Sequence, residues 1–169
     1  MPNGRSLPPG VPATAIITGT FLSGAMMGLS LMAVPLFLDT NTESAHMLNQ
    51  WARLYHYGHL LLPTMSVVTS LLYGYTAAGK RSSAQSWIAY AVAGVVTLSM
   101  IPFTLLVMVP TNNTLFRLAD EIKSDAAVTT LGQIQELVTR WGRMHFIRSL
   151  SPLVGAIIGL RALMKEGAV

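Results

Sequence analysis

The chain contains no cysteine and very few charged residues. The lack of cysteine excludes disulfide bonds and thiolate chemistry. Only 11% of the 169 residues are charged, whereas a soluble domain carries about a quarter. Apolar residues make up 51% of the chain, and the mean hydropathy is +0.50. The net charge of +4 is spread along the chain with no recognition motif, which argues against a nucleic-acid partner. These features indicate a membrane protein.

Two further absences narrow the chemistry. No Asp or Glu falls within the four longest apolar stretches, which argues against a carboxylate proton relay and against a carboxylate-bridged di-iron site. No Gly-rich dinucleotide loop is present, and the chain is too short to add a Rossmann domain to four spans. Nucleotide-dependent redox chemistry is therefore not expected.

Four apolar stretches, at about 13–38, 55–78, 87–109 and 144–164, are long enough to cross a bilayer core of about 30 Å. They predict an all-α fold, an integral membrane four-helix bundle in one domain covering residues 1–169. The second and fourth helices, expected at about 45–78 and 131–164, extend beyond the bilayer. The polar segment 111–143 is expected outside the membrane, and Pro102 should bend the third span.

Basic residues predict the orientation in the membrane. With four spans, both termini and the loop after the second span lie on one side. Apart from Glu166, the charged residues near these span ends are basic: Arg5, Lys80, Arg81, Arg161 and Lys165. The excess of positive charge predicts that both termini are cytoplasmic.

Polar side chains gather where spans meet the opposite membrane face. The third span ends in Pro110-Thr111-Asn112-Asn113, and Trp141, His145 and Arg148 follow at helical spacing on the last helix. Trp51, Tyr55 and His59 are spaced by four on the second helix. So many polar groups at the edge of an apolar bundle predict a binding site. The candidate residues are Trp51, Tyr55, His56, His59, Thr104, Thr111, Asn112, Asn113, Trp141, His145 and Arg148.

This set suits a flat, hydrophobic, weakly acidic aromatic substrate. A neutral imidazole can remove a proton from carbon or from a phenol. Asn112 and Arg148 can hold the enolate oxygen, and an electron-rich enolate can react with dioxygen without a cofactor. Two other readings remain open. Arg148 and His145 could be interfacial residues that reach for lipid headgroups, and His56, His59 and His145 could bind a metal.

Two segments, Pro102–Leu115 and Trp141–Arg148, resemble the anthrone oxygenase family of small four-span membrane proteins. The pattern Trp51…Tyr55…Gly58…Pro63 is similar to that of the family's second helix, and the resemblance covers nearly the whole chain. It implies that an anthrone is oxidised to the anthraquinone with molecular oxygen, without flavin or haem. It also implies roles for Asn112, Trp141, His145 and Arg148, with support from Tyr55.

The sequence and the resemblance together predict an oxygenase acting on an anthrone that resembles emodin anthrone, in polyketide biosynthesis. His145 is expected to be the base, with His59 as its rival, and Arg148 and Asn112 stabilise the substrate oxygen. The substrate-binding candidates are Trp51, Tyr55, Thr104, Thr111, Asn113 and Trp141.

No cofactor is expected to be required, with O2 as co-substrate. The partners expected are the aromatic substrate and the lipid bilayer, and the location is the endoplasmic reticulum or another internal membrane of a fungus. The oligomeric state stays open. The alternatives are a metal-dependent oxidase that uses the three histidines, and a non-catalytic scaffold or lipid-binding protein.

Overall fold

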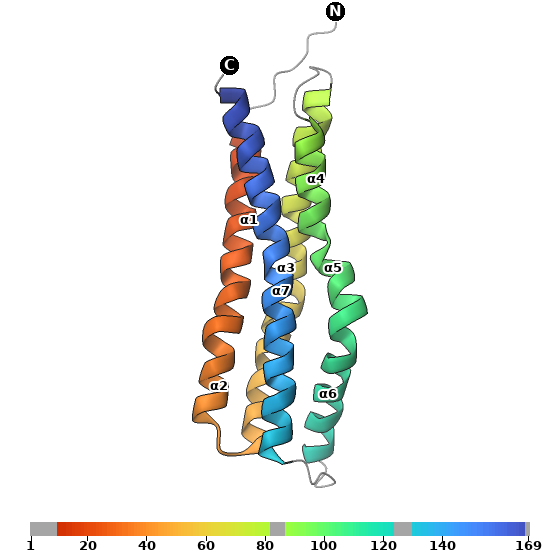
Figure 1. Ribbon diagram of the computed structural model, residues 1–169. Helices are drawn as coiled ribbons and strands as arrows, with labels where there is room; N and C mark the ends of the chain where they lie inside the picture. Colours follow the sequence, from red (N-terminus) through yellow and green to blue (C-terminus); the bar gives the residue numbers. More distant parts are fainter. Residues whose placement is uncertain (1–9, 82–86, 124–129, 168–169) are drawn as a thin grey trace, which may run out of the picture. The chain divides into compact units, whose positions relative to one another are not determined.

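The computed structural model describes residues 10–81, 87–123 and 130–167, and every element in them is helical (Figure 1). The α-helices are α1 (Gly10–Gly28), α2 (Val34–Thr40), α3 (Ser44–Arg81), α4 (Trp87–Leu98), α5 (Met100–Phe103), α6 (Val109–Lys123) and α7 (Leu131–Gly167). Two π-helical turns, η1 (Leu29–Ala33) and η2 (Thr104–Met108), interrupt the first and third helical stretches.

Four helical stretches, at Gly10–Thr40, Ser44–Arg81, Trp87–Ile122 and Leu131–Gly167, are long and apolar enough to cross a membrane. The all-α membrane bundle predicted from the sequence is therefore confirmed. At about 1.5 Å per residue, the 38 residues of α3 and the 37 of α7 measure roughly 55 Å, far more than the bilayer core. Both helices thus continue beyond the membrane, as expected.

The third stretch also continues past the predicted end of its span. Pro110 falls in the first turn of α6, and the helix runs on to Lys123. A proline is tolerated in a first helical turn because its missing N–H has no partner there. The segment 111–123 is therefore a direct continuation of the third span, and the bend expected at Pro102 takes the form of the break at Ser99 and the π turn η2.

The chain divides into two compact units, each of which contains a part of all four helical stretches. Unit 1 comprises 1–24, 63–101 and 149–169, and unit 2 comprises 25–62 and 102–148. Each unit is described by itself.

Unit 1 is held together by small residues on α7 that allow its neighbours to approach closely. A Cβ added to Gly155 would lie 2.8 Å from the carbonyl oxygen of Ala93 on α4. A Cβ added to Gly159 would lie 2.8 Å from the ring of Tyr73 on α3. Lipid provides no hydrophobic force between helices, so such close packing is a main source of their association. Gly155 and Gly159 thus lie on an internal packing face of α7.

The glycines of α1 behave differently. Nothing lies within 4 Å of a Cβ added to Gly24 or Gly28. These two residues form the small-xxx-small pair that the sequence marks for close helix contact. Within the described chain, no neighbouring helix uses it.

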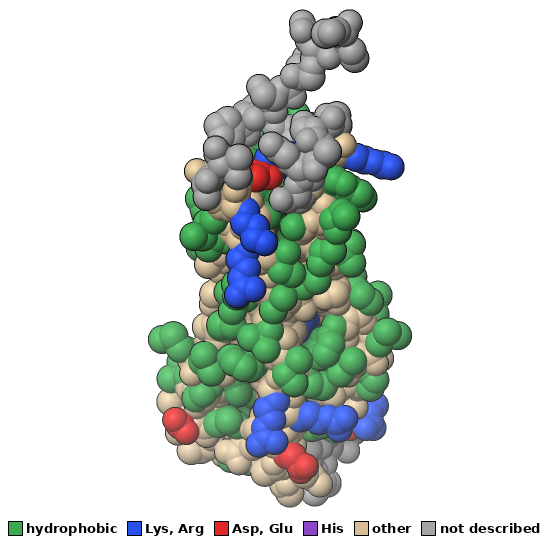
Figure 2. Space-filling model, turned by 45° about the horizontal axis from the view of Figure 1, so that its top comes forward, with side chains coloured by type: hydrophobic (Ala, Val, Ile, Leu, Met, Phe, Trp, Pro, Cys, Tyr) green, Lys and Arg blue, Asp and Glu red, His purple; other side chains and the backbone are tan. Residues whose placement is uncertain are grey.

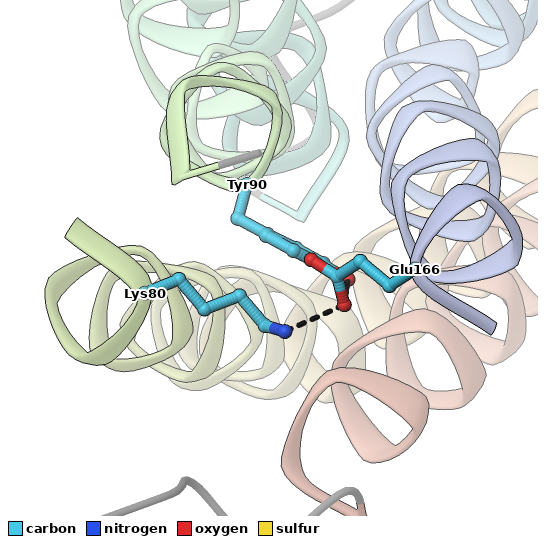
Figure 3. Close-up of polar contacts among 3 residues, drawn as sticks. All are labelled: Lys80, Tyr90 and Glu166. Carbon is cyan, nitrogen blue, oxygen red and sulfur yellow. Dashed lines mark hydrogen bonds and ion pairs between the residues drawn. The ribbon is translucent and has the colours of Figure 1, made fainter. Parts of the chain in front are cut away.

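A polar cluster joins the ends of three helices in unit 1. Lys80 at the end of α3 pairs with Glu166 of α7, and the hydroxyl of Tyr90 on α4 donates to the same carboxylate oxygen at 3.3 Å (Figure 3). The ammonium group of Lys80 also lies 5.7 Å from the centre of the Tyr90 ring. Because the side chains of Lys80 and Glu166 are only 18% and 14% exposed, the pair is screened less than a surface ion pair.

Unit 2 has its own apolar core, contributed by all four stretches. A Cβ added to Gly142 would contact Val34, so α7 and α2 approach closely there. The buried residues of this core are Val34, Met47, Leu48, Trp51, Met108, Leu115, Leu118, Ala119, Ile134, Val138 and Trp141. On α7 the buried positions advance by alternating steps of four and three, the periodicity of closely packed helices.

Much of the outer surface is apolar, as expected for helices that face lipid. Hydrophobic side chains dominate the visible face in Figure 2. Many large apolar side chains are more than half exposed, including Leu31, Met32, Leu60, Leu71, Val95, Leu105 and Leu106. In water such a surface would be an association hazard, but in a bilayer it is satisfied by lipid chains.

Candidate functional site

The centre of the candidate site is a pair of buried side chains on α7. His145 is 1% exposed and Arg148 is 8% exposed. The Nη2 atom of Arg148 lies 2.7 Å from Nε2 of His145. A spacing of three places both residues on one face of the helix, which faces the interior of unit 2. Neither side chain reaches a surface where a lipid headgroup could contact it.

The contacts of His145 define its protonation. A guanidinium has only donors, so Nε2 of His145 accepts the hydrogen bond from Arg148. The second nitrogen, Nδ1, lies 3.2 Å from Oγ of Ser30 in η1. Nδ1 therefore carries the proton and donates to Ser30, and the imidazole is neutral with its lone pair on Nε2.

Arg148 is held by a second polar contact. Its Nη1 atom donates to Oγ1 of Thr104 in η2 at 2.9 Å. The ion pairs of the described residues are Lys80–Glu166 and Arg117–Glu121, so Arg148 is a buried cation without a carboxylate partner there. Because burying an unpaired charge is costly, its position calls for a functional explanation.

A chain of aromatic contacts leads from this pair across unit 2. The ring of Trp141 lies 4.7 Å from that of His145, and Trp141 packs edge-on against Trp51 at 6.1 Å. Trp51 in turn contacts Tyr55 at 5.6 Å and Phe116 at 4.9 Å. Three helices, α3, α6 and α7, thus bring flat rings and one guanidinium into a continuous array.

Several buried polar atoms of the candidate residues in unit 2 have no hydrogen-bond partner among the described residues. They are Nε1 of Trp51, Oδ1 of Asn112, Nε1 of Trp141 and Nε of Arg148. Buried polar groups are normally paired, and each exception calls for a reason. Three of these atoms are N–H donors and one is an acceptor. They match a planar ligand that carries both oxygen acceptors and phenolic O–H donors.

The structure therefore gathers most of the predicted site residues. Trp51, Trp141, His145 and Arg148 lie in the array, and Tyr55 and Thr104 contact it. Thr111 and Asn112 are buried on the inner face of α6, whereas Asn113, the next residue, is exposed. Thr104 contacts Arg148, a partner that the sequence did not reveal.

His59, the rival base, lies on an exposed face of α3. Its ring stacks on Tyr55 with a centroid distance of 5.6 Å and an angle of 8°, and its Nδ1 lies 2.8 Å from the carbonyl oxygen of His56. The spacing of four explains the difference. Eight residues turn an α-helix by about 80° more than two full turns, so His59 rotates away from the face of Trp51.

The three-histidine metal set does not form. His56 and His59 are both exposed, and both ring nitrogens of buried His145 already contact Arg148 and Ser30. Within residues 10–81, 87–123 and 130–167, no group of three or more His, Cys, Asp or Glu side chains could hold a metal ion. In this structure the guanidinium of Arg148 contacts the nitrogen of His145 that a metal would need.

Sequence reasoning missed two residues of this site. Ser30 lies in a long apolar run, 115 positions from His145, and no spacing rule connects the two. Phe116 packs against both Trp51 and Tyr55. The sequence feature that could have identified Phe116 is its position, one helical turn after Asn112 on a helix that continues past Pro110.

Comparison with known proteins identifies the family. The family model described as anthrone oxygenase matches residues 51–158. An anthrone oxygenase of Paecilomyces divaricatus is 54% identical over 149 residues, which cover 87% of this chain and 91% of the relative. Anthrone oxygenases of Aspergillus fumigatus and Aspergillus novofumigatus are 47% and 51% identical, over 91% and 92% of this chain and 93% and 94% of theirs. No solved structure matches.

The family match contains Trp51, Trp141, His145 and Arg148, which the fold brings together, and the buried Asn112. A family model that covers more than half of the chain, and relatives of similar length at about half identity, agree with one another. The chain is an oxygenase and belongs to the anthrone oxygenase family.

Proposed function

We propose that this protein oxidises an anthrone to the corresponding anthraquinone with molecular oxygen, through a base-generated anthrolate. The observation that carries the proposal is the set of buried, unpaired polar atoms among flat rings in unit 2. A tricyclic phenolic anthrone offers aromatic faces for Trp51 and Trp141, oxygen acceptors for their N–H groups, and a phenolic O–H for Asn112. The names of the relatives support the same substrate class.

His145 is the base in this mechanism. Its lone pair on Nε2 is held by Arg148 in the described structure. An oxygen of the bound anthrone can accept a hydrogen bond from the guanidinium, and this bond strengthens as negative charge develops on that oxygen. When Arg148 turns towards that oxygen, Nε2 is released and can accept the proton from C10 of the anthrone. The N–H group at Nδ1 continues to donate its hydrogen bond to Ser30, so the imidazolium that forms is already oriented.

The remaining steps need no group other than dioxygen. The anthrolate transfers an electron to O2, and the two radicals combine at C10 to give a hydroperoxide after protonation. The hydroperoxide loses the second C10 hydrogen and its distal oxygen as water, which leaves the quinone carbonyl. One anthrone and one O2 thus give one anthraquinone and one water. Arg148 and Asn112 stabilise the charge on the substrate oxygen during this sequence.

Oxygen consumption by detergent-purified protein supplied with emodin anthrone tests this proposal. A strong chelator is included in one arm, and His145→Ala runs beside it because anthrones autoxidise. Quinone formation at one O2 per anthrone, unaffected by the chelator and lost in the variant, is the expected result. A rate equal to the background of boiled protein would reject anthrone oxidation. Loss to the chelator with recovery on adding one metal would reject the metal-free route.

The cellular setting is part of the proposal. The relatives are fungal proteins, and the four apolar stretches imply a membrane. We place the protein in the endoplasmic reticulum or another internal membrane of a fungus, with both termini in the cytoplasm. Protease accessibility of tags fused to each terminus in intact microsomes tests this orientation. Protection of either tag would contradict it.

A further inference from the structure

The two π turns of the described chain each supply a hydroxyl to the central pair. Ser30 is the second residue of η1 and contacts Nδ1 of His145. Thr104 is the first residue of η2 and contacts Nη1 of Arg148. All four residues lie in unit 2. Since π turns often occur at functional sites, their shared position here suggests a common purpose.

Both turns have the same local sequence pattern. The five residues of η1 are followed by Val34 and Pro35, and the five residues of η2 by Val109 and Pro110. A proline lacks the N–H for the carbonyl four residues earlier and its ring crowds that carbonyl. A wider turn relieves the crowding. Pro63 and Pro152 lie within uninterrupted α-helices, so a proline alone does not produce a π turn in this fold.

The extra residue in each π turn keeps the hydroxyl on the inner face. Met26, Ser30 and Val34 are all buried, although two successive steps of four rotate an α-helix by about 80°. Met100 and Met108 flank Thr104 in the same way, and both are fully buried. A π turn offsets this rotation because it contains one residue more than an α-helical turn. Without it, the hydroxyl and the core residues could not share one face.

The resulting contacts run in one direction. Arg148 donates to His145, Nδ1–H of His145 donates to Ser30, and the hydroxyl of Ser30 makes a long 3.5 Å contact to the carbonyl oxygen of Met26. The series ends on a carbonyl group, which can only accept. Thr104 fixes the other arm of the guanidinium. The opposite tautomer of His145 would place two donors face to face at Nε2.

We propose that Ser30 and Thr104 are positioning residues, set by the two π turns, which keep His145 in its Nδ1–H form and aim the guanidinium of Arg148. The proposal rests on the proposed function only for its readout in turnover. Its structural content, the tautomer of His145, can be measured without a substrate.

The kinetic test compares Ser30→Ala and Thr104→Val with two matched controls. Ser23→Ala removes a buried serine of α1, whose hydroxyl donates to the carbonyl oxygen of Ser149 at 2.8 Å. Thr97→Val removes another buried threonine of the third stretch, whose hydroxyl donates to the carbonyl oxygen of Ala93. Both controls lie in unit 1. We expect kcat to fall on the order of tenfold in each test variant, with little change in KM.

The controls are expected to retain wild-type kcat, and Thr104→Ser to recover most of the loss. A purely structural role for the hydroxyls would instead lower the amount of folded protein equally in test and control variants. Equal kcat in wild type, Ser30→Ala and Thr104→Val would overturn the proposal.

The second test is 15N NMR of the detergent-solubilised protein labelled with 15N-histidine. The signals of His145 are assigned by comparison with the His145→Gln variant. The side-chain shifts of His145 in the wild type should show protonated Nδ1 and unprotonated Nε2. We expect Ser30→Ala to introduce a second tautomer. Finding the Nε2–H form or an imidazolium in the wild type would overturn the proposal even if turnover is normal. If the wild type oxidises no anthrone but shows the Nδ1–H form, only the proposed function fails.

Discussion

Nη2 of Arg148 lies 2.7 Å from Nε2 of His145, one turn away on the same helix. A cation beside an imidazole keeps that imidazole neutral and occupies the lone pair that a base needs. We propose that the pair is a resting arrangement, in which an oxygen of the bound substrate takes over the hydrogen bond from Arg148 and so frees Nε2 of His145. Substrate binding and activation of the base are thus coupled through one hydrogen bond.

His145→Ala and His145→Gln should each lower kcat for anthrone oxidation by about 10²–10⁴-fold, because a general base contributes on that order. Initial rates of quinone formation at saturating O2 check this. His59→Ala is the matched control and should change kcat by no more than a few-fold, since His59 is exposed and contacts its own helix. Full turnover in His145→Ala would remove it from the role of base, and loss in His59→Ala would transfer that role.

Arg148→Met should separate activity from stability. Methionine fills a similar volume without a buried charge, so thermal stability should stay the same or rise. Activity should fall by roughly 10²–10³-fold, the usual effect of removing a donor to a developing oxyanion. Arg148→Lys keeps the charge but not the two-armed contact to His145 and Thr104, and should also lose most activity. Activity that falls only in proportion to folded protein would refute the electrostatic role.

Trp51→Phe and Trp141→Phe should raise KM for the anthrone by about tenfold each, and have a smaller effect on kcat. Phenylalanine keeps an aromatic ring but deletes the unpaired N–H, whose hydrogen bond to a charged oxygen is worth about 1.5–3 kcal/mol. Steady-state kinetics at several anthrone concentrations provide the measurement. Trp87→Phe, in unit 1, is the control. An unchanged KM in both test variants would mean that these indoles do not bind the substrate oxygens.

Gly155→Ala should destabilise the protein by about 1–3 kcal/mol, because the added methyl group meets the backbone carbonyl of Ala93 and the side chain of Thr97. Gly24→Ala, in the same unit, adds a methyl group where nothing lies within 4 Å and should be neutral or slightly stabilising. Unfolding in mixed micelles with increasing denaturing detergent compares the two. Equal stability would show that α4 and α7 can separate without cost.

Lys80→Met should lower stability by about 1–3 kcal/mol, between the values typical of exposed and of buried ion pairs. The substitution leaves the partly buried carboxylate of Glu166 without its cation. Adding Glu166→Gln should recover part of the loss, and a double-mutant cycle measures the coupling. Turnover should not change, because both residues belong to unit 1 and the candidate site to unit 2. Additive losses would mean that the pair contributes no net interaction.

Hydropathy predicted the helices of this protein well. An apolar run of membrane length is a strong signal, and the start of α7 at Leu131 and the end of α3 at Arg81 lie within a few residues of the expected positions. The pair His145 and Arg148 was also predictable, because a spacing of three on one helix does not depend on the rest of the fold. The same reasoning failed for His59, because two successive steps of four residues rotate its side chain away from the buried face of Trp51.

The partners of that pair could not be read from spacing. Ser30 and Thr104 lie on other helices, and their inward direction depends on π turns that add a residue to the helical repeat. Hydropathy has no information on such a local change of register. The recurring five residues followed by Val-Pro were present in the sequence, but Pro63 and Pro152 show that the same residue type can leave an α-helix intact.

The ring contact between Trp51 and Trp141 gives the protein a built-in optical reporter. Of the three tryptophans, these two lie 6.1 Å apart in the aromatic array, and the third, Trp87, lies in the other unit with Arg81 over its ring. In a Trp87→Phe background, all indole emission comes from the array. A planar chromophore that enters between these rings will quench that emission, so occupancy can be followed in real time under anaerobic conditions, before any oxygen is consumed.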